Sequence, residues 1–152
     1  MQQQASVIWK GSGKSGNGEI SSGSGALKNI FYSQATRSDG KRGTNPEELI
    51  AAAHASCFTM ALSGALTKVG YEVNKLETEV VISAEKINNE LRVISSHLKV
   101  EGDIPGIGEA QFRNFVDEVK VSCPISRVLN LEISAEARLK NNKQEIFLEQ
   151  MI

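Results

Sequence analysis

The chain has two cysteines, Cys57 and Cys123, and two thiols can perform nucleophilic and redox chemistry. Cys57 lies in the middle of a long apolar helical stretch, where a low dielectric favours the protonated, unreactive thiol. Cys123 directly precedes Pro124 at the expected start of a helix, where free backbone N–H groups favour a thiolate. Local physics therefore makes Cys123 the easier thiol to ionise, although a core cysteine and a turn cysteine without chemistry are the plainer readings.

A reactive Cys57 requires a cation close to its sulfur atom. Arg37 and Arg42 lie in the polar stretch before the helix and are the candidates, because a guanidinium stays charged even when it loses water. The sequence alone does not choose between these two arginines.

His54 lies one helical turn before Cys57 and allows two further kinds of site. It could activate Cys57 as a base, or it could share a metal ion with Cys123 and His97. The chain contains no Cys-x-x-Cys ligand motif, and a core histidine with satisfied hydrogen bonds explains the same position. All three interpretations stay open at this point.

The composition indicates one ordinary domain that does not bind polyanions. The 152 residues are 40% hydrophobic, and 17 lysines and arginines balance 18 aspartates and glutamates to a net charge of −1. This gives enough apolar material for one core and no field that would attract nucleic acid or an anionic membrane. The first six residues lack a secretory signal pattern, so we expect a cytoplasmic protein. In a reducing compartment, a disulfide between the two cysteines would serve chemistry rather than stability.

A strong helix signal positions Cys57. Asn45 is a good N-cap, Pro46 suits the first helical position, and Glu48 stands three residues after the cap. The helix should end at about Lys68, before Gly70, and its apolar character on nearly all sides predicts that other structure encloses it. The polar residues within the apolar stretch 49–69 argue against a membrane span.

Strands are expected on both sides of this helix, which predicts an α+β fold of one domain. Before it, strands should flank a turn at Asn17 and Gly18, a third strand should follow, and residues 37–43 should form a loop. After it, two long strands should meet at Asn88 and Asn89, followed by two shorter helices and a last strand. The expected strands cover residues 6–9, 30–33, 73–86, 91–101 and 131–139, the later helices begin near residues 110 and 123, and residues 141–152 have no clear role.

Two segments of the sequence resemble the OsmC/Ohr family of osmotically inducible and organic hydroperoxide resistance proteins. Residues 43–58 read GTNPEELIAAAHASCF and residues 121–127 read VSCPISR, and Trp9 and the Pro105-Gly106 pair stand in family order. The likeness covers roughly residues 5–139 and leaves residues 140–152 as a C-terminal tail. It implies an OsmC-like fold with antiparallel sheets around a long buried central helix, in an intertwined homodimer.

The resemblance also assigns roles, and it reverses the order of the two thiols given by local physics. It implies that Cys57 attacks the peroxide, that Cys123 resolves the product as a disulfide, that Arg37 serves the Cys57 thiolate and that Glu47 holds Arg37. The organic hydroperoxide resistance branch takes its arginine from an earlier loop, where this chain offers only Lys14. The likeness is therefore to the osmotically inducible branch.

The activity that the resemblance implies is reduction of organic hydroperoxides to alcohols, in oxidative and osmotic stress defence, without a cofactor or metal. A dithiol, such as the lipoyl group of a lipoylated protein, would reopen the disulfide. Phe58, Met60 and Phe115 would favour an alkyl hydroperoxide over hydrogen peroxide. A metal-binding protein that uses His54, Cys57 and Cys123, or a module that binds an apolar ligand in an interface pocket, is the alternative.

Geometry adds one expectation about the oligomer. Glu47 and Cys57 are ten residues apart, which is about 15 Å on a straight helix. One arginine cannot easily reach both, so the Glu47 beside a given Cys57 should come from the second subunit of a dimer.

Overall fold

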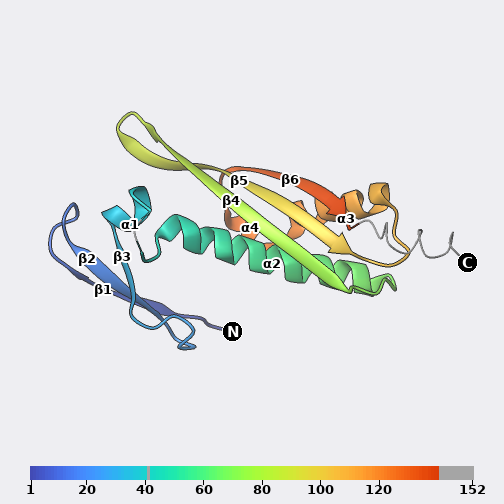
Figure 1. Ribbon diagram of the computed structural model, residues 1–152, viewed down its shortest axis with the longest axis horizontal. Coiled ribbons are helices and arrows are strands. Elements are labelled where there is room, and N and C mark those ends of the chain that lie inside the picture. Colours follow the sequence, from blue (N-terminus) through green and yellow to red (C-terminus); the bar gives the residue numbers. More distant parts are fainter. Residues whose placement is uncertain (41, 141–152) are drawn as a thin grey trace, which may run out of the picture. The chain divides into compact units, whose positions relative to one another are not determined.

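The computed structural model describes residues 1–40 and 42–140. Within them the chain forms two compact units, residues 1–50 and the residues from 51 onward, and each is described by itself. The C-terminal residues 141–152, whose role the sequence leaves open, lie outside the described part. The elements, labelled in Figure 1, are β1 Ala5–Lys10, β2 Asn17–Ser22, β3 Ile30–Ser33, α1 Gln34–Ser38, α2 Pro46–Lys68, β4 Lys75–Ile87, β5 Glu90–Asp103, α3 Glu109–Ser122, α4 Pro124–Val128 and β6 Glu132–Leu139.

The first unit contains an antiparallel sheet of order β1-β2-β3. The strands expected at residues 6–9 and 30–33 are confirmed, but the turn expected at Asn17 and Gly18 is wrong. These two residues begin β2, and the chain turns before them. Gly18 serves packing instead, because a Cβ there would lie 2.5 Å from the Tyr32 ring and 2.9 Å from the Trp9 ring.

The sequence suggested a loop at residues 37–43, but part of this polar stretch is helical. Residues Gln34–Ser38 form the short helix α1, which begins with a capping box: Ser33 accepts from the Thr36 N–H, and the Thr36 hydroxyl accepts from the Ser33 N–H. Arg37 therefore stands on a helix in its last turn. The signal was present in the Ser-x-x-Thr spacing, but the helix is too short to have an apolar period.

The helix α2 begins and ends where the sequence predicts. The Asn45 side chain accepts from the Glu48 N–H at 2.8 Å, Pro46 is the first helical residue, and Gly70 takes φ 98° beyond the end. The Glu48 carboxylate does not close a capping box on Asn45, because it accepts from the Thr44 hydroxyl at 2.9 Å.

The second unit contains a three-stranded sheet of order β4-β5-β6. The predicted hairpin between β4 and β5 is confirmed, and Asn88 and Asn89 take the left-handed φ of 51° and 65° that its two-residue turn requires. The strand β6 pairs with β5 in parallel, so the expectation of purely antiparallel sheets is wrong for this strand. A parallel pair needs a crossover, and α3 and α4 provide it.

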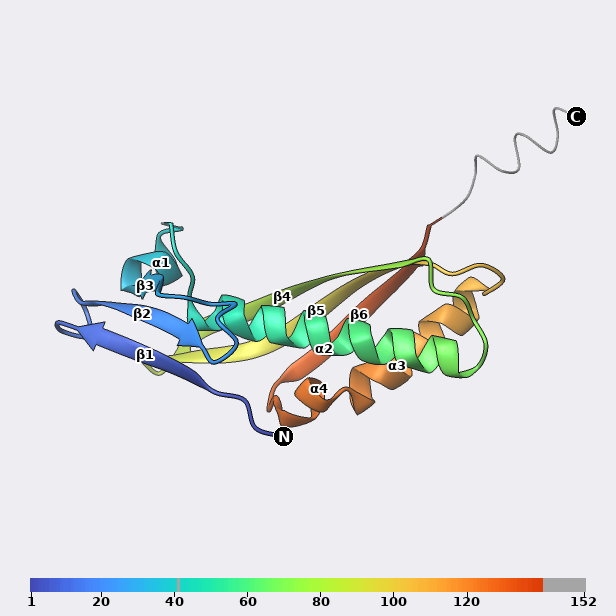
Figure 2. The ribbon, with the colours of Figure 1, turned by 90° about the horizontal axis from the view of Figure 1, so that it is seen from below.

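The core of the second unit lies on one face of this sheet. Figure 2 shows α2 running along the strands, with α3 and α4 beside it. Alternate residues of β5 meet the apolar sides of α2 and α3, because side chains alternate across a strand. The fully or nearly fully buried apolar residues are Phe58, Leu62, Leu66, Leu98, Val100, Ile104, Phe112, Val116, Val119 and Cys123.

Within the part of the chain that the structure describes, only one side of α2 is buried, which corrects the expectation that other structure encloses the helix. The buried residues recur once per turn, at His54, Phe58, Leu62 and Leu66, whereas Met60 is 73% exposed. Its length and composition would also allow α2 to cross a bilayer, a property shared by core helices of soluble proteins. Among residues 1–40 and 42–140, an apolar side of α2 is thus left without a partner.

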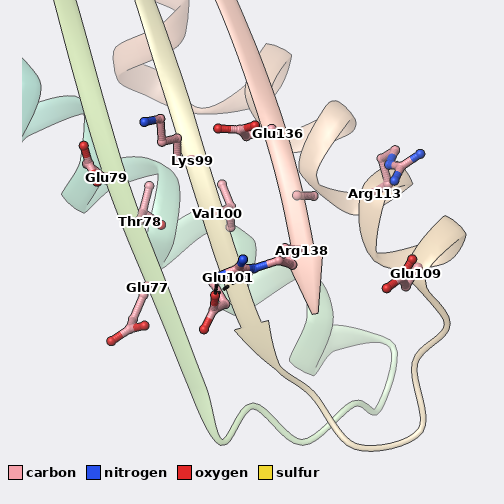
Figure 3. A pocket seen from close by; sticks show the side chains of 11 residues that line it. Glu77, Thr78, Glu79, Lys99, Val100, Glu101, Glu109, Arg113, Glu136 and Arg138 are labelled. Carbon is pink, nitrogen blue, oxygen red and sulfur yellow. Dashed lines mark hydrogen bonds and ion pairs between the residues drawn. The ribbon is translucent and has the colours of Figure 1, made fainter. Parts of the chain in front are cut away.

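The opposite face of the sheet is charged. A hollow of about 970 Å³ on that side is bordered by side chains of β4, β5, β6 and α3, and Figure 3 shows glutamates among lysine and arginine there. The residues that line this hollow include no cysteine and no histidine. Five glutamates face one lysine and two arginines there, so this face is a solvated sheet surface with a small excess of negative charge.

Two valines on α3 offer a matched test of this core. Val119 is 4% exposed and Val121 is 70% exposed. We expect Val119→Ala to lower the free energy of unfolding by about 2 kcal/mol, because it removes buried carbon and leaves a cavity. Val121→Ala should change it by less than about 0.5 kcal/mol. Urea unfolding measures both, and equal effects would contradict the assigned core.

Candidate functional site

The two cysteines meet in the second unit, although they are far apart in the sequence. Cys57 is half-buried on α2 and packs against the core cluster that contains the fully buried Cys123. The two thiols are close enough for Cys123 to influence the ionisation of Cys57, and both cysteines are free. Cys123 is the N-cap of α4, as the sequence predicts, because Pro124 occupies the first helical position.

The pKa of the Cys57 thiol is raised above its ordinary value. Burial is the main cause, since a low dielectric disfavours the thiolate. The Ile125 backbone N–H donates toward the sulfur and lowers the pKa, while the contact with Cys123 raises it further. A reactive thiolate at this position therefore needs an added positive charge, as the sequence suggested.

The other two predicted site residues meet in the first unit. The Arg37 Nε donates to Glu47 Oε2 at 3.1 Å, with side-chain exposures of 33% and 18%. Within the described residues, this is the only hydrogen bond of the Arg37 side chain, so its two Nη groups are available. The pair holds a guanidinium in one orientation; as a partly exposed ion pair it adds little to stability.

The local sequence holds Arg37 in place through the junction between α1 and α2. The Asn45 amide donates to the Thr36 carbonyl at 3.4 Å, and the Thr44 N–H donates to the Phe31 carbonyl at 3.0 Å. Gly43 permits this close return with φ 141°, since a Cβ there would lie 2.6 Å from the Phe31 oxygen. Arg42, the other candidate, forms no ion pair among the described residues.

The structure thus assembles the predicted residues as two pairs, Cys57 with Cys123 and Arg37 with Glu47. Each pair lies within one of the two units.

His54 is the core histidine of the plainer interpretation. Its Nδ1 lies 2.7 Å from the Ser96 hydroxyl and its Nε2 lies 2.8 Å from the Ser126 hydroxyl. Both ring nitrogens are therefore occupied, and His97 binds Ser134 at 2.6 Å instead of sharing a metal site. No cluster of metal ligands occurs among residues 1–40 and 42–140. Ser96 and Ser126 were not predictable as partners of His54, because isolated serines form no recognisable sequence pattern.

Comparison with known proteins identifies the family. A family model described as OsmC-like protein matches residues 38–138, more than half of the chain. The chain belongs to the OsmC-like family. Among curated OsmC relatives, Peroxiredoxin OsmC of Escherichia coli strain K12 is 40% identical over 133 residues, which are 88% of this chain and 93% of that protein.

Solved structures support the same OsmC-like fold. The organic hydroperoxide resistance protein OhrB of Bacillus subtilis superposes with a TM-score of 0.68 at 25% identity, covering 90% of this chain and 98% of that one. An OsmC-like protein of unknown function from Vibrio cholerae has a TM-score of 0.72 at 17% identity, covering 90% and 99%. The predicted OsmC-like α+β fold is therefore confirmed.

The buried His54 should make this OsmC-like protein less stable in acid. Burial lowers its pKa below the ordinary value of 6.5, so the unfolded chain takes up a proton first as the pH falls. Stability is then lost as the pH drops below about 6.5, with a slope of up to about 1.4 kcal/mol per pH unit. Between pH 7.5 and 5.5, we expect His54→Gln to lose about 1 kcal/mol less than the wild type.

Urea unfolding at the two pH values measures this difference. Ser96→Ala, which keeps the histidine, should retain the acid dependence of the wild type. Parallel pH curves for His54→Gln and the wild type would show that His54 is not responsible.

Proposed function

We propose that the protein is a cysteine-based peroxidase that reduces organic hydroperoxides to alcohols. The observation that carries the proposal is the proximity of two free thiols of unequal burial, Cys57 half-buried and Cys123 fully buried. The 40% identity with Peroxiredoxin OsmC supports peroxide as the class of substrate, and the likeness to OhrB supports its organic form.

The reaction proceeds in three steps: attack on the peroxide, formation of a disulfide and its reduction by a dithiol. The Cys57 thiolate attacks the distal oxygen of the hydroperoxide, the O–O bond breaks, and the alkoxide leaves as the alcohol after it takes a proton. Cys57 is then a sulfenic acid. The Cys123 thiol condenses with it, a disulfide forms and water leaves. An external dithiol reduces the disulfide by exchange and is itself oxidised.

Arg37 supplies the positive charge that the Cys57 thiolate needs. Burial opposes ionisation of Cys57, and a guanidinium keeps its charge in a partly desolvated site. Glu47 binds Nε of Arg37 and leaves the two Nη groups to face the sulfur and the peroxide. Arg37 and Glu47 thus act as a preoriented electrostatic pair.

The active unit is a homodimer in which Arg37 and Glu47 of one chain serve Cys57 of the other. The uncovered side of α2 borders a shallow groove of about 840 Å³ lined partly by small residues, including Ala52, Ala55, Ser56 and Ser63. Such residues let a second chain approach closely. Because Arg37 is bound to Glu47, about 15 Å along α2 from Cys57, the thiol of the same chain is a poor partner for this guanidinium.

The remaining features of the proposal follow the family resemblance. The protein acts in the cytoplasm in defence against oxidative or osmotic stress, and the reductant is a dithiol such as the lipoyl group of a lipoylated protein. Nucleic acid and membranes are not partners, because the net charge of −1 gives no attraction to polyanions.

Consumption of cumene hydroperoxide with a lipoyl dithiol as reductant tests the activity. The wild type should turn over many times, and should consume cumene hydroperoxide faster than hydrogen peroxide at equal concentration. Cys57→Ser should lose all turnover, because it lacks the attacking thiol. Cys123→Ser should consume about one equivalent and stop when dithiol is absent. No consumption by the wild type would contradict the proposal.

Mixed dimers test whether the site crosses the subunit interface. Cys57→Ser and Arg37→Gln chains with different affinity tags are co-expressed, and the heterodimer is isolated by both tags. It contains one complete site, formed by Arg37 of the first chain and Cys57 of the second, so we expect about half of the wild-type turnover. Either parent homodimer should be slower by on the order of 100-fold or more. A heterodimer as inactive as its parents would place Arg37 and Cys57 of one chain in the same site.

A further inference from the structure

Three buried polar side chains connect three elements of the second unit. Ser96 of β5, His54 of α2 and Ser126 of α4 are hydrogen-bonded in a row, at 2.7 and 2.8 Å, and are 0%, 0% and 6% exposed. We call these residues the Ser–His–Ser row. The cysteine chemistry proposed above does not use it.

The row lies next to the thiols on both chain segments. His54 precedes Cys57 by one turn of α2, and Ser126 follows Cys123 by one turn at the start of α4. The hydrogen bond between His54 and Ser126 therefore ties together the same two segments that the sulfur atoms join.

The helix α4 needs such a tie. It has only five residues, and no side chain caps its N-terminus. A helix this short is not stable by itself, because one or two turns do not compensate for the cost of nucleation. The position of Cys123 relative to Cys57 thus depends on contacts between α4 and the rest of the unit.

We propose that His54 is a positioning residue, which holds the first turn of α4 through Ser126 and thereby keeps Cys123 against Cys57. Its role in turnover rests on the peroxidase function proposed above. Ser96 satisfies Nδ1, while the packing around this fully buried ring keeps Nε2 against Ser126. Ser96 itself lies on the sheet and does not touch α4 through this hydrogen bond.

Two steps of the cycle depend on this position. The Ile125 N–H, next to Ser126, donates toward the Cys57 sulfur and favours the thiolate. When Cys57 is a sulfenic acid, Cys123 must close from contact to a bond of about 2.05 Å, which tolerates little displacement. Freeing α4 should therefore weaken the thiolate and slow disulfide closure, and the exposed sulfenic acid would be oxidised further to sulfinic acid by excess peroxide.

A matched pair of serine variants tests the proposal. Ser126→Ala and Ser96→Ala each remove one buried hydrogen bond of His54, so a purely structural role predicts similar effects of both. The first readout is the pH dependence of Cys57 alkylation by iodoacetamide, in a Cys123→Ser background. The second is the rate of disulfide closure after one equivalent of cumene hydroperoxide, with both cysteines present.

We expect Ser126→Ala to slow alkylation at pH 7 about threefold, through a higher pKa of Cys57, and to slow closure about tenfold. Ser96→Ala should stay within about twofold of its parent in both readouts, since packing still holds the ring against Ser126. Equal effects of the two variants, or no effect of Ser126→Ala, would overturn the proposal.

Substitution of His54 gives an independent test if a serine variant does not fold. Gln at this position can place an N–H near the position of Nε2 and keep Ser126, whereas Asn is shorter and can keep only Ser96. His54→Gln should retain most of the alkylation and closure rates, and His54→Asn should behave like Ser126→Ala. The reverse order would overturn the proposal.

The alkylation readout separates this inference from the proposed function, because it uses no peroxide. Normal alkylation by Ser126→Ala, in a protein that consumes peroxide, would refute the positioning role and leave the peroxidase intact. A slower alkylation, in a protein that consumes none, would support the positioning of Cys57 and refute the peroxidase.

Discussion

Burial of one side of α2 against β5 and the crossover helices is the constraint on which the rest of the structure depends. It brings Cys57 to Cys123, and it shields Cys123 fully and Cys57 partly from water. The same burial raises the pKa of Cys57 and so opposes the chemistry that the contact allows. In the peroxidase proposed above, the guanidinium of Arg37, oriented by Glu47, supplies the positive charge that this burial makes necessary.

The topology of the second sheet explains why Cys123 stands where it does. Since β6 pairs with β5 in parallel, the chain must return across the sheet, and α3 and α4 make this return. Cys123 lies at the bend between these two helices, where the backbone leaves helical geometry with ψ 130°. A bend of this kind frees the N–H groups of the next turn, and one of them faces the Cys57 sulfur.

Local signals in the sequence predicted most of the elements, and non-local contacts account for what they missed. Asn45, Pro46 and Gly70 bound α2 through short-range capping, and Asn88 and Asn89 bound the hairpin through their tolerance of positive φ. The hairpin expected at Asn17 and Gly18 failed because Gly18 is required by two aromatic rings from neighbouring strands. The residues of β6 do not themselves indicate whether this strand pairs in parallel or antiparallel.

The candidate site also has some features that the sequence indicates and others that depend on non-local contacts. The type of the two cysteines made them candidates, and the family resemblance added Arg37 and Glu47; the roles of all four stay predictions. The hydrogen bonds of His54 were not predictable, because its partners lie 42 and 72 residues away and are ordinary serines. The uncovered side of α2 was likewise invisible, since an apolar helix pattern does not say which chain covers it.

The unequal burial of the two cysteines has a kinetic consequence. Within the chain, Cys123 is 0% exposed and only Cys57 reaches the surface. In thiol–disulfide exchange the incoming thiolate must reach the sulfur that it attacks, so a reductant would open a Cys57–Cys123 disulfide at Cys57 and expel Cys123. The oxidant and the reductant would then reach the same atom, the sulfur of Cys57, by the same route and one after the other. The kinetic mechanism would be ping-pong. An excess of either substrate would slow the half-reaction of the other, because the two compete for access to Cys57.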